Sequence, residues 1–148
     1  MFNPNRDQSR QFFIDTWAKF QRRDPLLPLS ALEEKTAAII ALHPEYQRVL
    51  ENPTSFMTKD WRPEAGDINP FLHLGFHLAI QEQLDIDQPH GIRAIHAQLA
   101  AKHDDEHAAK HEILECLGET LWQSQRTGQA LDGALYLQLL RQRVPPIQ

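Results

Sequence analysis

Prolines that stand beside capping residues divide this sequence into segments typical of helices. Asn3-Pro4 and Asn69-Pro70 each place an N-cap residue before a proline at the first helical position. The segment Ser30–Glu33 matches a capping box. Between such signals the apolar residues recur at spacings of three and four, as Phe13 and Trp17 do, and no stretch alternates as a strand would. The pattern predicts an all-α protein.

The expected architecture is an irregular compact bundle of about six helices in a single helical domain, residues 1–148. Its core should be formed by the helices over 70–84 and 104–126, the first of which is apolar nearly all round. Residues 53–67 are expected to form a loop. The other helices are expected over 4–24, 30–42, 44–50 (short), 92–101 and 132–144.

Composition narrows the class of protein. A net charge of −5, and basic residues near the N-terminus that are interleaved with acidic ones, argue against nucleic acid as a partner. The longest apolar run, residues 37–42, is far shorter than a membrane span, and the N-terminus lacks the apolar region of a signal peptide, so we expect no membrane association and a cytoplasmic location. The single cysteine, Cys116, excludes an internal disulfide and a cysteine-rich zinc module.

Histidine placement is the main chemical signal in the chain. Residues 63–148 hold seven of the eight histidines. His73 and His77 are four residues apart, and His103, His107 and His111 repeat that spacing. Residues four apart share a helix face, so each pair can present two imidazoles to one metal ion. Chance placement would give roughly 0.4 such pairs, and the sequence has three.

The central hypothesis is therefore a transition-metal site built from His73, His77, His107 and His111. Glu115, four residues after His111, is the fifth candidate, either as a ligand or as the acceptor of a ligand's N–H. Imidazole ligands suit Zn, Fe or Ni. The competing interpretation is that these histidines are buried structural residues, each hydrogen-bonded within the core.

Three further features have weaker signals. His43 is a candidate ligand supplied by a loop, although a helix-ending residue whose ring bonds a carbonyl is the favoured interpretation. His103 should lie near the start of the long helix, facing solvent or supporting a ligand. His103-Asp-Asp-Glu-His107 matches the inverted zinc-peptidase signature, but the pattern is short and those enzymes are much larger. Cys116 fits a small core residue better than a nucleophile.

A set of short motifs spread along nearly the whole chain carries a family resemblance. The motifs are Met1-Phe-Asn-Pro-Asn-Arg6 with Phe12-Phe13 and Trp17, His43-Pro-Glu-Tyr46, Asn69-Pro-Phe-Leu-His73 through His77-Leu-Ala-Ile80, Asp87-Gln-Pro89 with Gly91-Ile-Arg93, and Glu115-Cys-Leu-Gly-Glu119 with Leu121-Trp122. In combination they resemble a family of short bacterial proteins catalogued as domain of unknown function eighteen forty-one. The resemblance implies a compact bacterial protein and supplies no activity or catalytic residues.

Two functional interpretations remain open from the sequence. The first is a helical protein that binds one transition-metal ion, with a metal-dependent, hydrolase-like activity only if a coordination position stays open to water. A looser similarity to four-helix metalloproteins of the damage-inducible type, which hold a metal with three histidines, favours this interpretation. The alternative is a metal-free protein–protein interaction module with structural histidines and an unknown protein partner. Oligomeric state is not indicated by the sequence.

Overall fold

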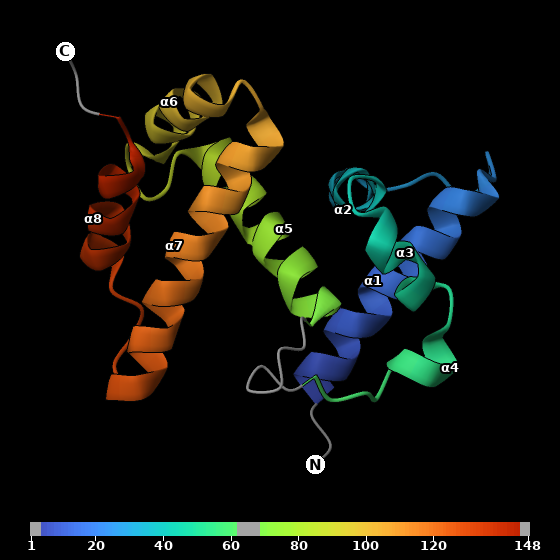
Figure 1. The fold of residues 1–148 in the computed structure, drawn as a ribbon. Helices are drawn as coiled ribbons and strands as arrows, with labels where there is room; N and C mark the ends of the chain where they lie inside the picture. The colour runs from blue at the N-terminus through green and yellow to red at the C-terminus, as the bar shows by residue number, and fades with distance from the viewer. Residues whose placement is uncertain (1–3, 62–68, 146–148) are drawn as a thin grey trace. The chain divides into compact units, whose positions relative to one another are not determined.

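The computed structural model describes residues 4–61 and 69–145, which form eight α-helices and no strand (Figure 1). The helices are α1 (Pro4–Arg22), α2 (Ala31–Ala41), α3 (Pro44–Leu50), α4 (Pro53–Phe56), α5 (Pro70–Ile86), α6 (Ile92–His103), α7 (Glu106–Thr127) and α8 (Gly133–Arg143). The all-α class is confirmed.

The predicted number of about six helices is wrong. The short helix expected over 44–50 is α3, which has 7 residues. The element that the sequence does not predict is α4, a single turn of 4 residues that begins at Pro53 inside the segment expected to be a loop. Asn3, expected to be a cap, and residues 62–67, expected to continue that loop, lie outside the described residues. The boundary before α7 also differs, because Asp104 ends α6 in the left-handed region (φ 52°) and α7 begins two residues later.

Side-chain caps define where the longer helices begin. Ser30 and Glu33 form the reciprocal capping box expected for α2. Asn69 Oδ1 accepts the backbone N–H groups of Phe71 at 3.0 Å and Leu72 at 3.2 Å, and so caps α5. Asp105 caps α7 and Asp132 caps α8 in the same way. Each cap satisfies N–H groups that the first helical turn leaves unpaired.

The chain divides into two compact units, unit 1 (residues 1–78) and unit 2 (residues 79–148), and α5 contributes residues to both. In unit 1, α1, α2 and α3 pack on one another and α3 on α4. Polar side chains add cross-links: Lys19 pairs with Glu33 at 2.9 Å, and Trp17 Nε1 donates to Glu51 at 3.3 Å. The buried core of unit 1 consists of Phe13, Ile14, Trp17, Ile40, Leu50, Phe71 and Leu74.

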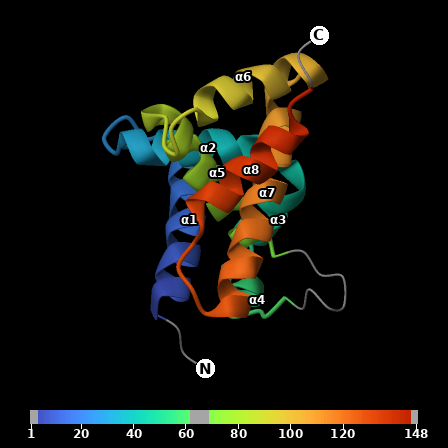
Figure 2. The ribbon, with the colours of Figure 1, turned by 90° about the vertical axis from the view of Figure 1, so that its left-hand side faces the viewer.

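Unit 2 is built from α6, α7, α8 and the C-terminal half of α5. Helices α7 and α8 run antiparallel, and α6 lies near the end of the pair at which α7 begins (Figure 2). The Tyr136 hydroxyl on α8 donates to Gln83 on α5 at 2.8 Å. The buried apolar residues of this unit include Ile80, Ile92, Leu99, Ala109, Ile113 and Leu140. Among the described residues, no helix is long and apolar enough to cross a membrane.

Candidate metal-binding site

His43 lies in the turn between α2 and α3, where the following proline starts the next helix. Its ring Nδ1 is 2.8 Å from the carbonyl oxygen of Ile39. A carbonyl oxygen can only accept a hydrogen bond, so Nδ1 carries the proton and, in a neutral ring, Nε2 keeps its lone pair. A metal-binding histidine is commonly oriented in this way, with its other ring nitrogen donating to a backbone carbonyl. The carbonyl bond expected for His43 is present, and it leaves Nε2 as the ligand atom.

Two histidines of α5 lie beside this ring within unit 1. His73 Nε2 is 3.2 Å from His43 Nε2 and also 3.2 Å from His77 Nε2. The ring centroids of His43 and His77 are 4.6 Å apart. The one-turn spacing of His73 and His77 thus brings both rings to one place, and the α2–α3 turn adds a third imidazole that the spacing pattern did not include.

The three Nε2 atoms cannot all satisfy one another when the rings are neutral. His73 Nε2 has two neighbouring Nε2 atoms but carries either one proton or one lone pair. As a donor it can give its proton fully to only one neighbour, and as an acceptor it faces the lone pair of His43. A cation bound by His43 and His77 would take up the lone pairs of both nitrogens, so that neither has to accept a hydrogen bond from His73.

This cluster is shielded from solvent. His43 is 1% exposed and His77 is 3% exposed. The Tyr46 ring stacks on His43 with centroids 5.5 Å apart and planes 8° from parallel, and it meets His73 edge-on. Burial, reinforced by Glu45, raises the pKa of the Tyr46 phenol, so this hydroxyl stays neutral. Water is therefore a poor competitor for the ring nitrogens of His43 and His77.

In unit 2, α7 carries a second pair of imidazoles in its first two turns. Asp105 caps this helix by accepting the backbone N–H of His107 at 2.9 Å. The rings of His107 and His111 have centroids 4.2 Å apart, and both side chains are half-buried. The i, i+4 spacing thus places both imidazoles on one face, as the sequence predicted.

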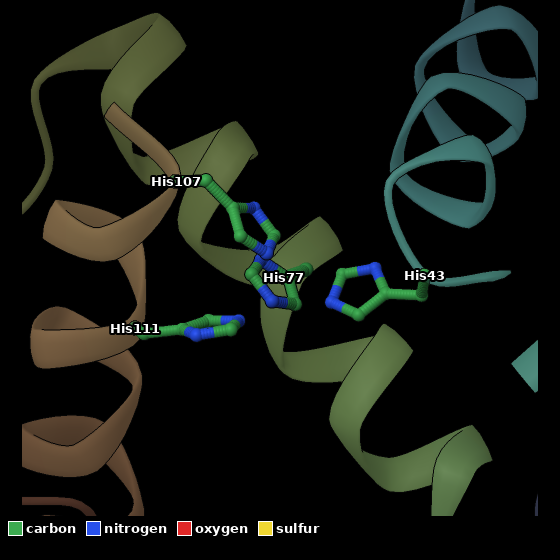
Figure 3. A group of neighbouring side chains, drawn as sticks. All are labelled: His43, His77, His107 and His111. Atoms are coloured by element: carbon green, nitrogen blue, oxygen red, sulfur yellow. The ribbon is translucent and has the colours of Figure 1, made fainter. Parts of the chain in front are cut away.

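Each pair has the spacing that a shared ion requires. Figure 3 draws His43 and His77 of unit 1 and His107 and His111 of unit 2. Within each pair, one ring nitrogen of each residue lies within 4.8 Å of the other's. Two nitrogens bound to one tetrahedral ion at about 2.05 Å are about 3.3 Å apart. To share an ion, the nitrogens of each pair would have to come from within 4.8 Å to about that distance.

The remaining sequence candidates have other partners in unit 2. Glu115 is mostly exposed and pairs with Arg143 at 2.7 Å. His103 ends α6 and bonds Glu112, which also pairs with Lys102 at 3.1 Å and Arg143 at 3.3 Å. Burial alone would raise the pKa of Glu112, but the hydrogen bonds from these three residues outweigh it and hold this pKa below its usual range.

The peptidase signature and the cysteine have structural explanations. His103 belongs to α6 and His107 to α7, with the helix break at Asp104 and Asp105 between them, so the five residues do not form the continuous helical turn of that signature. Cys116 is buried, and burial raises the pKa of its thiol, which keeps it protonated and unreactive. The preference for a core role at Cys116 therefore agrees with its surroundings.

Comparison with known proteins gives one family assignment. No curated protein and no solved structure matches the chain. The model of one family, Domain of unknown function (DUF1841), matches residues 5–142. This match covers nearly the whole chain and confirms the resemblance carried by the sequence motifs. The protein therefore belongs to the DUF1841 family.

Proposed function

On the sequence hypothesis of paired histidines on two helices, we propose that this protein binds one transition-metal ion through four imidazoles, those of His43 and His77 and those of His107 and His111; the geometry within each pair supports it. The observation that carries the proposal is the His43 ring, whose Nδ1–H is held by the Ile39 carbonyl and whose Nε2 points to the α5 histidines. A ring held in this way is oriented before the ion arrives, which lowers the entropic cost of binding.

The two other residues predicted as ligands have different roles in this proposal. His73 Nε2 lies 3.2 Å from the Nε2 atoms of His43 and His77. In this proposal His73 packs beside these ligands and makes no hydrogen bond to them, because their lone pairs are directed at the ion. Glu115 stabilises unit 2 through its ion pair with Arg143. The replacement of His73 by His43 follows from burial and orientation, because the Nδ1–H bond of His43 leaves only Nε2 for a metal.

The donor set indicates the class of ion and of function. Neutral imidazole favours Zn, Fe or Ni over Mg or Ca, which prefer oxygen ligands. Four protein ligands fill a tetrahedral shell, as in structural zinc sites, whereas catalytic zinc sites keep one position for water. The proposal is therefore a metal-binding protein whose ion has a structural role, in preference to a metal-dependent hydrolase.

A metal titration tests this function. Tag-free protein, stripped with a chelator, is titrated with Zn²⁺ by isothermal titration calorimetry. We expect saturation at one ion per chain, and a loss of binding of at least about 100-fold when His77 and His111 are both replaced by alanine. His90→Ala is the matched control, since its side chain is 94% exposed. Circular dichroism verifies that each variant is folded.

The same titration separates this proposal from the metal-free interaction module. If the histidines only satisfy hydrogen bonds in the core, the stripped protein binds no ion stoichiometrically, and the variant with both replacements binds Zn²⁺ as weakly as the unchanged chain. Binding that is equal in the double variant and the wild type would point to an adventitious surface site and would contradict the proposal.

A further inference from the structure

A second feature of unit 1, independent of the histidines, is the buried arginine of α1. Arg10 is 3% exposed. Its Nη1 donates to the carbonyl oxygens of Met57 at 2.9 Å and Lys59 at 2.8 Å. The guanidinium also lies over the rings of Trp61 and Phe71, with its carbon 5.2 and 5.1 Å from their centroids. These contacts hold the Arg10 side chain in one orientation.

The opposite edge of this guanidinium makes no hydrogen bond within the described part of the chain. Arg10 Nε is buried and has no partner there, and both hydrogen bonds of the side chain use Nη1. Nε–H and the adjacent Nη2–H are parallel donors whose spacing matches the two oxygens of a carboxylate. A buried donor without a partner is costly, so this edge favours an acceptor that the described residues do not supply.

A cavity of about 230 Å³ lies beside this arginine. Arg10 lines it together with the polar side chains of Arg6 and Ser9. The rest of its wall includes Phe71, Phe76 and the backbone at Gly75 of α5. The cavity is below the usual range of roughly 300–1,000 Å³ for drug-sized ligands, so its occupant must be small. A lining that combines two arginines with aromatic rings matches a small molecule with an anionic group and an apolar body.

The electrostatics of the cavity also favour an anion. Burial, and then the neighbouring charge of Arg6, lower the pKa of Arg10, because both disfavour its positive charge. Asp60 and Asp7 oppose this effect, and they pair with Arg6 at 3.0 and 3.3 Å. These carboxylates partly balance the positive charge of Arg6. A negative group at the guanidinium of Arg10 would balance its positive charge directly.

We propose that this cavity binds a small organic carboxylate, with its carboxylate group at the guanidinium of Arg10 and its apolar part against Phe71 and Phe76. The planar guanidinium of Arg10 favours a carboxylate, which can accept two parallel hydrogen bonds from it. The aromatic rings in the wall favour a ligand with an apolar part over a hydrated inorganic ion. The site lies wholly within unit 1 and requires no metal ion.

Benzoate is the probe for this proposal, with benzamide as its neutral match and inorganic phosphate as the competing anion. Binding is followed by two-dimensional NMR of labelled full-length protein. We expect saturable shifts with benzoate at the residues that line the cavity, with affinity at least about tenfold weaker for benzamide and for phosphate. Phosphate binding more tightly than benzoate would overturn the carboxylate assignment, and no saturable shift with benzoate would overturn the site.

Two substitutions assign binding to this cavity. Arg10→Lys keeps the charge but loses the fork, and should weaken benzoate binding about tenfold or more. Gly75→Leu places a side chain in the cavity, since a Cβ at Gly75 meets nothing within 4 Å, and should abolish binding in a chain that stays folded. Gly133→Leu in α8 is the matched control and should still bind, because a Cβ there also meets nothing within 4 Å and this residue does not line the cavity. Unchanged affinity in Gly75→Leu would contradict the proposal even if Arg10→Lys fails to fold.

Discussion

The Nε2 atoms of His43 and His73 lie 3.2 Å apart, although His43 belongs to the α2–α3 turn and His73 to α5. The contact joins the α2–α3 turn to α5 within unit 1. The Ile39 carbonyl holds the proton of the His43 ring on Nδ1, so Nε2 is the ring nitrogen that would bind the metal in the proposed site.

Replacing His43 should therefore weaken metal binding strongly, although the i, i+4 spacing pattern does not include this residue. In His43→Ala we expect the affinity for Zn²⁺ to fall at least about 100-fold, measured by competition with a chromogenic chelator. His43→Gln is a useful second variant, because its amide can keep the bond to the Ile39 carbonyl without offering an imidazole. Wild-type affinity in both variants would contradict the role of His43.

The unit 2 pair can be tested against its own neighbour on the chain. His107→Ala should weaken Zn²⁺ binding about 10- to 100-fold, while His103→Ala should leave it unchanged, because His103 bonds Glu112 and ends α6. His103 and His107 each lie four residues from another histidine. A difference between the two variants would therefore reflect where each ring lies in the structure and not its spacing in the sequence. Equal losses in the two variants would favour the peptidase-like assignment of His103 and His107.

Metal binding should raise thermal stability, since the ion binds the folded chain in preference to the unfolded one. At a free Zn²⁺ concentration about 100 times the Kd, the free energy of unfolding rises by about 2.7 kcal/mol, which corresponds to an increase in Tm of roughly 5–11 °C for a chain of this size. The measurement is calorimetry with and without a chelator. The His77→Ala and His111→Ala double variant is the control and should show no shift.

The half-buried His96 of unit 2 gives a pH dependence of stability that is separate from the metal. Burial, and then the charge of Lys110, lower its pKa from the ordinary value of 6.5 in the folded chain. The unfolded chain then binds more protons just below pH 6.5, so the folded state loses stability as the pH falls from 6.5 toward the lower folded value. In chelator, His96→Gln should reduce this loss, measured by urea unfolding at pH 7.5 and pH 5.5. An identical loss in both proteins would exclude His96 as its source.

Glu112 should also stabilise unit 2 in a pH-dependent way, but here the titrating group is an acid, in contrast to the imidazole of His96. Its carboxylate receives hydrogen bonds from His103, Lys102 and Arg143, and its pKa lies below 4.5. The stabilisation is present above that ordinary value and is lost as the pH falls through the folded pKa. We expect Glu112→Gln to cost about 1 kcal/mol at pH 7 and to match the wild type near pH 3, measured by urea unfolding. A difference that persists at low pH would show that charge is not the cause.

Most helix boundaries could be predicted because the relevant signals are local. Ser30 with Glu33, Asn69 with Pro70, and Asp132 each act within one turn of their own helix. The single turn α4 was missed, because 4 residues are too few to show a helical period. The sequence predicts that the long helix begins at Asp104, whereas this residue ends α6 with a left-handed backbone. Such a conformation is not marked in the sequence when the residue is an aspartate and not a glycine.

The site could be predicted only as far as it lies on single helices. Spacing finds His73 with His77 and His107 with His111, since each pair depends on helix geometry alone. The contribution of His43 depends on how α2 and α3 pack beside α5, which no spacing encodes, although the His43-Pro-Glu-Tyr46 motif was already one of the family features. Glu115 fits the spacing, but its actual partner, Arg143, comes from another helix.

X-ray absorption spectroscopy of the Zn²⁺-loaded full chain tests the central claim most directly, because it counts the imidazoles around the ion. We expect one zinc ion per chain, coordinated by about four nitrogens at about 2.0–2.1 Å, with the multiple-scattering pattern that imidazole ligands give. His111→Ala should lower the imidazole count by one. A shell of five or six oxygen-dominated ligands, or a count unchanged in that variant, would contradict the four-histidine site.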